Sequence, residues 1–283
     1  MHPRGPSGAR RGLTVVPEGH SLHRLARRHQ RRFAGTQVRV SSPQGRFSDA
    51  AMIDGRVFRC ASAWGKHLFH IYAAHDGDVE RIVHVHLGLY GSFTERPVPM
   101  PEPRGQVRMR IVGTEWGTDL RGPTACEVID EAQMSAILAR LGPDPLRRDV
   151  DPEPAWTRIS KSRRAIGALL MDQSVLAGVG NVYRSELLFR HGIDPYRPGR
   201  DIDRAEFSAA WDDLVELMKV GVRRGRIIVV RPEHDRGAPP YGPRRPRTYV
   251  YRRVGEPCRL CGTTIRSAEM EGRNLFWCPT CQG

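Results

Sequence analysis

The chain has 283 residues, 39% of them hydrophobic, which suits about two domains with their own cores. It contains no apolar run of about 18 residues, and its first 15 residues lack the apolar stretch of a signal peptide. We therefore expect a cytoplasmic protein without a membrane span. A formal charge of +14 and a pI near 10.3 favour a polyanionic partner, most commonly nucleic acid, over a merely basic surface.

The basic residues are almost all arginines. Only Lys66, Lys161 and Lys219 are lysines among the 45 basic residues. Arginine stays protonated at any workable pH, whereas lysine can release its proton. Each lysine is therefore a candidate for chemistry that arginine cannot perform, although a plain surface charge is the simpler interpretation for any one of them.

The N-terminal half predicts one helix followed by strands. Residues 17–34 carry apolar side chains at three- and four-residue steps, which predicts an amphipathic helix with Pro17 in its first turn. From about residue 37 to residue 130, valine, isoleucine and aromatic residues alternate with polar ones in short runs between turns. This pattern predicts a β-sandwich or a barrel. A short helix is expected at residues 131–141.

The C-terminal half has a different character. Residues 142–155 are rich in proline and aspartate and predict a linker between domains. Residues 156–222 have helical spacing, with one helix expected to end near Gln173. Residues 223–247 hold eight arginines, which predicts a basic loop or a solvated charge run. Residues 248–283 predict a compact cysteine module.

The cysteine module has the spacing of a metal site. Cys258 and Cys261 form one C-x2-C pair, Cys278 and Cys281 form another, and 16 residues separate the pairs. Four thiolates at this spacing predict a closed tetrahedral zinc site, and a redox dithiol is the weaker alternative. The intervening segment predicts a hairpin that projects Arg273 from its tip, where it could meet a phosphate.

Residues 172–189, DQSVLAGVGNVYRSELLF, predict a glycine-rich turn between two helices. Gly178 and Gly180 lie in the turn, and Asn181 opens the second helix. Glycines allow a close backbone approach, and a helix N-terminus offers unpaired N–H groups to an anion. The segment therefore predicts a clamp for the DNA phosphate backbone, with an ordinary tight turn as the alternative.

Several motifs together resemble one family. They are PEGHSLHRL near the start, GKHL at 65–68, LGPDPL at 141–146, LLMDQSVLAGVGNVYRSELLF at 169–189 and GRNLFWCPTCQ at 272–282. In this order they resemble the formamidopyrimidine-DNA glycosylase / endonuclease VIII family from residue 16 to the C-terminus, and the endonuclease VIII branch in particular. The resemblance implies a bifunctional DNA repair enzyme that removes an oxidised base and then nicks the strand.

The resemblance also implies catalytic residues. The family nucleophile is an N-terminal proline, so Pro17 must carry a free secondary amine to form a Schiff base with the sugar. Residues 1–16 would then be absent from the mature enzyme, as a mis-assigned start or a processed segment. Glu18 would act as the acid/base. Lys66 would contact phosphate and donate a proton in β-elimination, and Arg273 would assist δ-elimination.

DNA-binding residues follow from the same resemblance. Asn181 matches the phosphate-binding asparagine, with Gly178 and Gly180 in the turn before it, and Arg140 matches another DNA-contacting arginine. Leu89 and Tyr90 match the wedge that fills the gap left by a flipped nucleotide. A core leucine and a strand tyrosine are the alternatives for this pair.

Two positions depart from the pattern of the branch. Ser21 stands where a second acid is usual, and Gly88 stands where the first wedge position is often glutamine. The mechanism expected here therefore does not rely on either position.

The expected protein is of the α+β multidomain class. Its parts are a tail at 1–16, a catalytic β-sandwich with a leading helix at 17–141, a linker at 142–155, a helix–two-turn–helix domain with a basic loop at 156–247 and a four-cysteine zinc ribbon at 248–283. We expect a monomer that binds one structural zinc ion and damaged DNA, and favours oxidised pyrimidines. An 8-oxoguanine or formamidopyrimidine glycosylase and a non-catalytic damaged-DNA-binding protein remain the alternatives.

Overall fold

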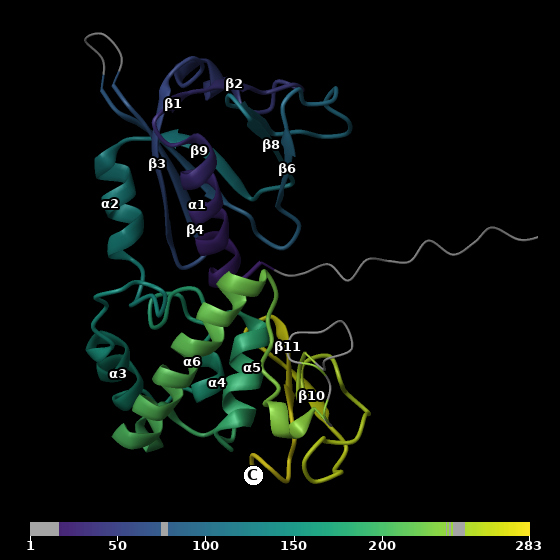
Figure 1. Cartoon of the computed structure of the whole chain (residues 1–283). Coiled ribbons are helices and arrows are strands. Elements are labelled where there is room, and N and C mark those ends of the chain that lie inside the picture. The colour runs from purple at the N-terminus through teal and green to yellow at the C-terminus, as the bar shows by residue number, and fades with distance from the viewer. Residues whose placement is uncertain (1–16, 75–78, 236, 238, 240–246) are drawn as a thin grey trace, which may run out of the picture.

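The structure is a computed structural model that describes residues 17–74, 79–235, 237, 239 and 247–283. The tail at residues 1–16, expected to be absent from the mature enzyme, lies outside the described residues. The remaining chain forms a β-rich lobe and a helical lobe that carries a β-hairpin (Figure 1). Within the described part, no helix is both long and apolar enough to cross a membrane.

The leading helix α1 (Gly19–Phe33) forms as its apolar spacing predicts. Leu22, Ala26 and Phe33 are buried against the β-rich core. The helix begins later than expected, because Glu18 has an extended backbone and is the N-cap. Pro17 therefore precedes the helix and does not form its first turn.

The β-rich lobe is a sandwich of two antiparallel sheets, which decides between the sandwich and the barrel. One sheet has the order β1-β3-β4-β5-β9 and the other β2-β7-β8-β6. The strands are β1 (Thr36–Gln37), β2 (Arg39–Ser41), β3 (Val57–Trp64), β4 (His67–Tyr72), β5 (Arg81–His86), β6 (Ser92–Pro97), β7 (Met109–Val112), β8 (Trp116–Arg121) and β9 (Ala125–Ile129). A 3-10 turn (Ser48–Met52) follows β2.

Helices cover the two faces of the five-stranded sheet. Helix α1 packs on β3 and β4, and α2 (Glu131–Ala139) packs on the opposite face against Phe69, Ile82 and Ile129. A capping box formed by Asp130 and Gln133 starts α2. The β3–β4 turn at one end of this sheet contacts the helical lobe, because Gly65 lies against Ala177 and Gly178.

The helical lobe contains α3 (Glu153–Ser160), α4 (Ile166–Leu169), α5 (Asn181–Arg190) and α6 (Arg204–Arg224). Two expected boundaries were wrong. The helix expected to end near Gln173 ends at Leu169, because the Asp172 side chain accepts from the backbone and hydroxyl of Ser174 and supports a turn there. Helix α3 begins inside the expected linker, at Glu153. Two further 3-10 turns (Gly199–Asp201 and Pro232–His234) flank α6.

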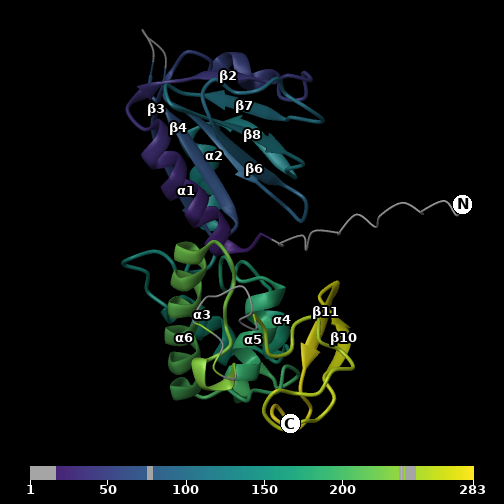
Figure 2. The ribbon, with the colours of Figure 1, turned by 45° about the vertical axis from the view of Figure 1, so that its right-hand side comes forward.

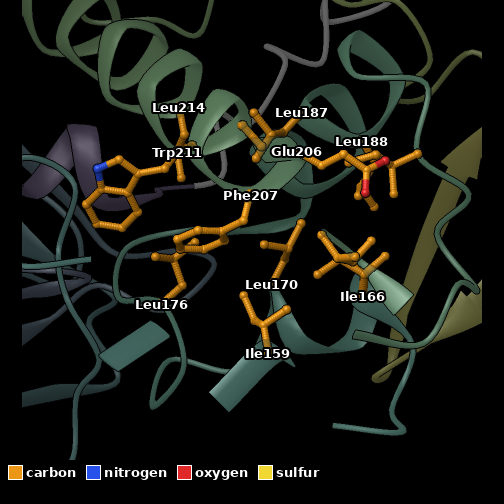
Figure 3. Close-up of a pocket in the computed structure, with 13 residues that line it drawn as sticks. Ile159, Ile166, Leu170, Leu176, Leu187, Leu188, Glu206, Phe207, Trp211 and Leu214 are labelled. Atoms are coloured by element: carbon orange, nitrogen blue, oxygen red, sulfur yellow. The ribbon is translucent and has the colours of Figure 1, made fainter. Parts of the chain in front are cut away.

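The core of the helical lobe surrounds a small apolar cavity of about 30 Å³. Side chains from α3 to α6 point into it, and Phe207, Trp211 and Leu214 supply the α6 side (Figure 3). The surface of this cavity is apolar although Glu206 is one of its lining residues, and it contains none of the expected catalytic residues.

The C-terminal hairpin consists of β10 (Arg266–Met270) and β11 (Arg273–Trp277). Glu271 and Gly272 connect the strands with φ angles of 55° and 63°, the backbone that a two-residue hairpin turn requires. The hairpin stands beside α4 and α5 with its turn toward the β-rich lobe (Figure 2). Arg273 is the first residue after this turn, as the sequence predicted.

Candidate active site between the two lobes

A cavity of about 480 Å³ lies between the lobes and the hairpin. It brings together eight of the residues predicted from the sequence, although they are spread over most of the chain. These residues are Pro17, Glu18, Lys66, Leu89, Tyr90, Gly180, Asn181 and Arg273. The cavity lining also includes His86, Tyr251 and Asn274, which sequence reasoning did not identify.

Glu18 is fully buried at the N-terminus of α5. Its carboxylate accepts hydrogen bonds from the backbone N–H groups of Gly180 at 3.0 Å, Val182 at 2.8 Å and Tyr183 at 3.3 Å. These are N–H groups that the helix itself leaves unpaired. A Cβ atom at Gly180 would lie 2.5 Å from the Glu18 Cδ, so only glycine fits there. Glu18 thus joins the first helix to the two-turn loop.

Burial sets the protonation of this carboxyl group. It raises the pKa of Glu18 above its usual value, against the opposing effects of Lys66 and the three N–H donors. A glutamic acid with a raised pKa keeps its proton closer to neutral pH. The residue beside Pro17 is therefore suited to donate a proton to a reacting group.

Lys66 lies in the tight turn between β3 and β4 and is half-buried. Burial lowers its pKa, Glu18 partly restores it, and Arg273 and Arg184 lower it further. A lysine with a lowered pKa exchanges a proton more readily than an exposed one, which arginine in the same place could not do. The turn depends on Gly65, which has a φ of +56°.

Glycines allow the two lobes to touch by their backbones. The Gly19 N–H donates to the Gly178 carbonyl oxygen at 2.8 Å. A Cβ atom at Gly19 would lie 2.8 Å from the Gly178 Cα, and one at Gly65 would lie 3.0 Å from Ala177. The predicted clamp glycines thus contact the protein itself: Gly178 packs on the β-rich lobe, and Gly180 packs on Glu18.

Asn181 connects α5 to the hairpin. Its side-chain Nδ2 donates to the carbonyl oxygen of Asn274 at 2.9 Å, and its Oδ1 accepts from Arg184. Arg184 is fully buried and also donates to the Met270 carbonyl at 3.2 Å. Sequence reasoning missed Arg184, although an arginine on the core face of a helix was a usable signal.

Arg273 itself is exposed at the hairpin tip. The adjacent turn is held from the helical lobe by Arg164, which pairs with Glu271 at 3.1 Å and with Asp172 at 2.9 Å. The hairpin therefore has attachments near its tip at Arg164, Asn181 and Arg184. Together they keep the guanidinium of Arg273 on the side of the cavity.

Leu89 and Tyr90 lie in the turn between β5 and β6, and their exposed fractions are 37% and 81%. Neither residue lies in a strand or in the core. The preceding Gly88 has a φ of +63° and donates its N–H to His86 Nδ1 at 3.2 Å. The same nitrogen lies 2.8 Å from Thr124 Oγ1. His86 thus adds an imidazole to the cavity lining that the sequence had not revealed.

Arg140 lies outside this cavity. It follows the last turn of α2 and lines a separate cavity of about 450 Å³ with His67, His84 and Glu127. His67 and His84 are 2.8 Å apart between Nδ1 and Nε2, and Glu127 is 2.8 Å from His84. The structure thus places Arg140 on the other face of the sheet from the sandwich core, beside α2.

The four cysteines of the C-terminal module converge. Their sulfur atoms lie within 4.8 Å of one another, with Cys261 and Cys278 3.4 Å apart and Cys258 and Cys281 3.9 Å apart. Tetrahedral zinc–thiolate bonds of about 2.3 Å need sulfur separations of about 3.8 Å, so the donor set and spacing fit zinc. Among the described residues this is the one such cluster of metal-ligating side chains.

Comparisons with known proteins agree with this arrangement. Residues 141–232 match the formamidopyrimidine-DNA glycosylase H2TH domain, and residues 255–283 match the zinc finger found in FPG and IleRS. Endonuclease 8 1 of Mycobacterium tuberculosis (strain ATCC 25618 / H37Rv) is 70% identical over 272 residues, covering 94% of this chain and 100% of that protein. Formamidopyrimidine-DNA glycosylase of Stutzerimonas stutzeri (strain A1501) is 34% identical over 204 residues, 70% of this chain and 74% of that one.

The fold is shared with solved structures. A complex of Lactococcus lactis Fpg with DNA containing an abasic site has a TM-score of 0.73 at 19% identity, and covers 94% of this chain and 99% of that one. A structure of MutM with DNA containing carbocyclic 8-oxo-G gives the same values.

The shared fold and the closely related relative define a DNA repair glycosylase with a zinc finger. The chain belongs to the formamidopyrimidine-DNA glycosylase / endonuclease VIII family. Like its relatives it is a DNA glycosylase and AP-site lyase of base excision repair, so the α+β multidomain class and the enzyme class expected from the sequence are confirmed.

Proposed function

We propose that this enzyme excises oxidised bases, pyrimidines above all, and then cuts the strand by β,δ-elimination. One observation carries the proposal. Glu18, the neighbour of Pro17, is buried with its carboxylate on the N-terminus of α5 and opens onto the same cavity as Lys66 and Arg273. A buried acid, a lysine with a lowered pKa and an exposed arginine around one cavity suit successive proton transfers on a sugar.

Pro17 is the nucleophile in this proposal. Its nitrogen attacks the sugar C1′, and the ring C1′–O bond opens as Glu18 gives a proton to the ring oxygen. The base then leaves with the electron pair of the glycosidic bond and takes up the proton that the attacking amine releases. The product is an iminium between Pro17 and C1′. Only a free secondary amine can do this, so we propose that residues 1–16 are absent from the working enzyme.

Strand cleavage follows from the iminium. Loss of a proton from C2′ expels the 3′ phosphate in β-elimination, and a second elimination expels the 5′ phosphate. Lys66 is proposed to contact phosphate and donate a proton in the first step, and Arg273 to bind the phosphates and assist the second. The lowered pKa of Lys66 supports its role, because an ammonium group with a lower pKa is a stronger acid and donates its proton more easily.

DNA recognition is proposed to use the remaining residues. The exposed pair Leu89 and Tyr90 would enter the helix where the nucleotide has flipped, and Asn181 would bind phosphate beside it. Arg140 would contact DNA away from the lesion. One zinc ion is proposed to hold the hairpin and to take no part in the chemistry, since four thiolates leave no open position.

We propose that the enzyme acts as a monomer, because Pro17, Glu18, Lys66 and Arg273 of one chain meet in the same cavity. We propose that the enzyme works in the cytoplasm, at the nucleoid in a bacterial cell. We keep the expected domain division as part of the proposal, with α3 beginning inside the linker at 142–155.

Pyrimidine preference is supported by Leu89 and Tyr90 at the wedge positions and by the 70% identical relative, which is named Endonuclease 8 1. The test is cleavage of two matched duplexes, one with thymine glycol and one with 8-oxoguanine, by a protein that begins at Pro17. We expect faster cleavage of the thymine glycol duplex. Faster cleavage of the other duplex would favour the alternative 8-oxoguanine glycosylase.

The Schiff base is tested by borohydride trapping. Protein that begins at Pro17 should form a covalent adduct with lesion-bearing DNA, and protein with an uncleaved extension before Pro17 should not. A matched duplex without a lesion is the control. An extended protein that traps and cleaves at the same rate would overturn the assignment of Pro17, and binding without any trapping would favour a damaged-DNA-binding protein.

A further inference from the structure

The segment Gly142–Asp144, inside the expected linker, is packed between two functional loops. On one side, Gly142 donates its N–H to the Gln173 carbonyl at 2.9 Å and Ala177 donates to the Pro143 carbonyl at 3.0 Å. On the other side, Trp64 Nε1 donates to the Gly142 carbonyl at 3.1 Å. All three residues of the segment are buried. The segment therefore connects the two-turn loop rigidly to the turn that carries Lys66.

Asp144 makes the central contacts. Its side chain is fully buried, and its Oδ2 accepts from the Gly65 N–H at 2.7 Å and lies 2.7 Å from His23 Nε2. Its Oδ1 accepts from the Leu146 N–H at 2.9 Å. Both oxygens thus face N–H donors, an arrangement that a carboxylate satisfies and an amide cannot. The donors come from α1, the β3–β4 turn and the chain just after the segment.

The bond to Gly65 bears directly on Lys66, the next residue. Gly65 adopts the left-handed region and lies against Ala177 and Gly178, so the turn has little room to shift toward the helical lobe. The Oδ2 atom of Asp144 holds the N–H of the same residue, Gly65. These two contacts hold the backbone of Gly65, directly before Lys66, and the Lys66 side chain lines the cavity together with Glu18.

We propose that Asp144 is a positioning residue for Lys66, and that its bond to the Gly65 N–H holds the lysine where it can reach the sugar. Asp144 itself does not line the cavity. The inference rests on the role proposed for Lys66 in strand cleavage. It assigns a task in the reaction to a residue of the segment that the sequence presents as a mere linker.

The substitution Asp144→Asn tests this at constant size. An asparagine has one acceptor oxygen and one NH2 donor group. If the oxygen accepts from the Gly65 N–H, the NH2 group faces the Leu146 N–H, donor against donor. In the reverse orientation the NH2 group faces the Gly65 N–H instead. Either orientation moves the turn or the segment. Asp149→Asn is the matched control, because Asp149 is an exposed acid of the same linker.

The experiment uses the full zinc-loaded enzyme beginning at Pro17, with single-turnover reactions on abasic-site DNA. Two rates are measured: formation of the borohydride-trapped adduct, and strand cleavage. We expect Asp144→Asn to slow cleavage by about 10- to 100-fold, the effect of one lost hydrogen bond to a charged group. Adduct formation should change by less than about twofold, because Pro17 and Glu18 keep their places.

A double-mutant cycle with Lys66→Ala separates positioning from general damage. If Asp144 acts through Lys66, adding Asp144→Asn to Lys66→Ala should slow cleavage no further. A further loss of the same size would show a structural effect and overturn the proposal. Normal cleavage by Asp144→Asn, with slow cleavage by Lys66→Ala, would overturn the positioning role of Asp144 and leave the proposed role of Lys66 intact. Normal cleavage by Lys66→Ala would overturn the lysine's proposed function and the positioning proposal with it.

A second variant keeps the test decisive if Asp144→Asn does not fold. Trp64→Phe removes the bond from Trp64 Nε1 to the Gly142 carbonyl and keeps an aromatic ring at the end of β3. It should slow cleavage by about three- to tenfold with adduct formation unchanged, since it loosens the same turn through a neutral bond. Equal losses in both rates, or none in either, would contradict the proposal.

Discussion

The side-chain amide of Asn181 donates to the backbone carbonyl of Asn274 at 2.9 Å, and this contact joins the first residue of α5 to the hairpin. Its consequence is geometric. The helix N-terminus that binds Glu18 and the strand that begins at Arg273 become parts of one surface. A residue predicted only to bind phosphate thus also holds two parts of the site together.

Replacing Asn181 with alanine should loosen the hairpin from α5. Loss of its bonds to Asn274 and Arg184 leaves the buried guanidinium of Arg184 with one partner fewer. We expect strand cleavage to slow by about 10-fold or more, from the loss of about 1.5 kcal/mol or more of hydrogen bonding. Ser267→Ala, an exposed change on the hairpin, is the control. Single-turnover cleavage at unchanged zinc content is the measurement, and an unaltered rate would contradict the role of this contact.

The sequence predicted the local parts of the site well. The clustering of the four cysteines is predictable because C-x2-C places two thiolates on one knuckle, and the place of Arg273 at the hairpin tip is predictable from the glycine before it. The contact of Glu18 with Val182 joins residues 164 positions apart, and nothing in the spacing of either segment predicts it. The spacing of apolar residues within a segment predicts which face of a helix or strand is buried. Contacts between distant residues depend instead on how the helices and strands pack together.

The misplaced boundaries have the same physical origin. The helix expected to end near Gln173 ends at Leu169, because Asp172 caps a turn with its own side chain. The segment at Gly142–Asp144 has the composition of a linker, yet it is buried because its polar groups find partners in both lobes. Arg184 was hidden by an apolar helical pattern, in which an arginine is normally at the surface.

Replacing Cys278 with serine should release the zinc ion and disorder the base of the hairpin. Cys278 is buried, and its N–H donates to Gln282, whose side chain in turn donates to the Ile193 carbonyl of the helical lobe. We expect loss of zinc by metal analysis and a loss of cleavage of about 10-fold or more as Arg273 is misplaced. Cys60→Ser should keep both zinc and activity. Full cleavage by a zinc-free Cys278→Ser protein would remove the hairpin from the mechanism.

The rate of adduct formation should depend on pH through Glu18. Burial raises the pKa of this carboxyl above the 4.5 of an exposed glutamate, so the proton donor persists to higher pH. As the pH rises through the raised pKa, the donor is lost and the rate should fall. The opposite limb at low pH comes from protonation of the amine of Pro17.

Single-turnover trapping from about pH 5 to about pH 9 measures this profile. Glu18→Gln should slow adduct formation and abolish the decline at higher pH. Glu131→Gln, an exposed change at the start of α2, should keep the profile of the parent enzyme. A decline that persists unchanged in Glu18→Gln would assign it to another group.

The helical lobe should be sensitive to changes around its small cavity. Leu214 of α6 is fully buried and lines the existing space of about 30 Å³ with Phe207 and Trp211 (Figure 3). Leu214→Ala extends a void that is already present, in a core where helices α3 to α6 all meet. The surrounding side chains cannot collapse onto it without moving a helix, so the unfolding free energy should fall by about 2–5 kcal/mol.

Denaturant unfolding of the zinc-loaded protein measures this change, with Ser208→Ala on the exposed face of α6 as the control. That variant should stay within about 0.5 kcal/mol of the parent enzyme. Because Leu214 does not line the catalytic cavity, adduct formation by the folded Leu214→Ala protein should be unchanged at low temperature. A loss of stability under about 1 kcal/mol would mean that the lobe repacks around the cavity. A slower adduct rate in a fully folded sample would mean that α6 helps to set the position of Glu18.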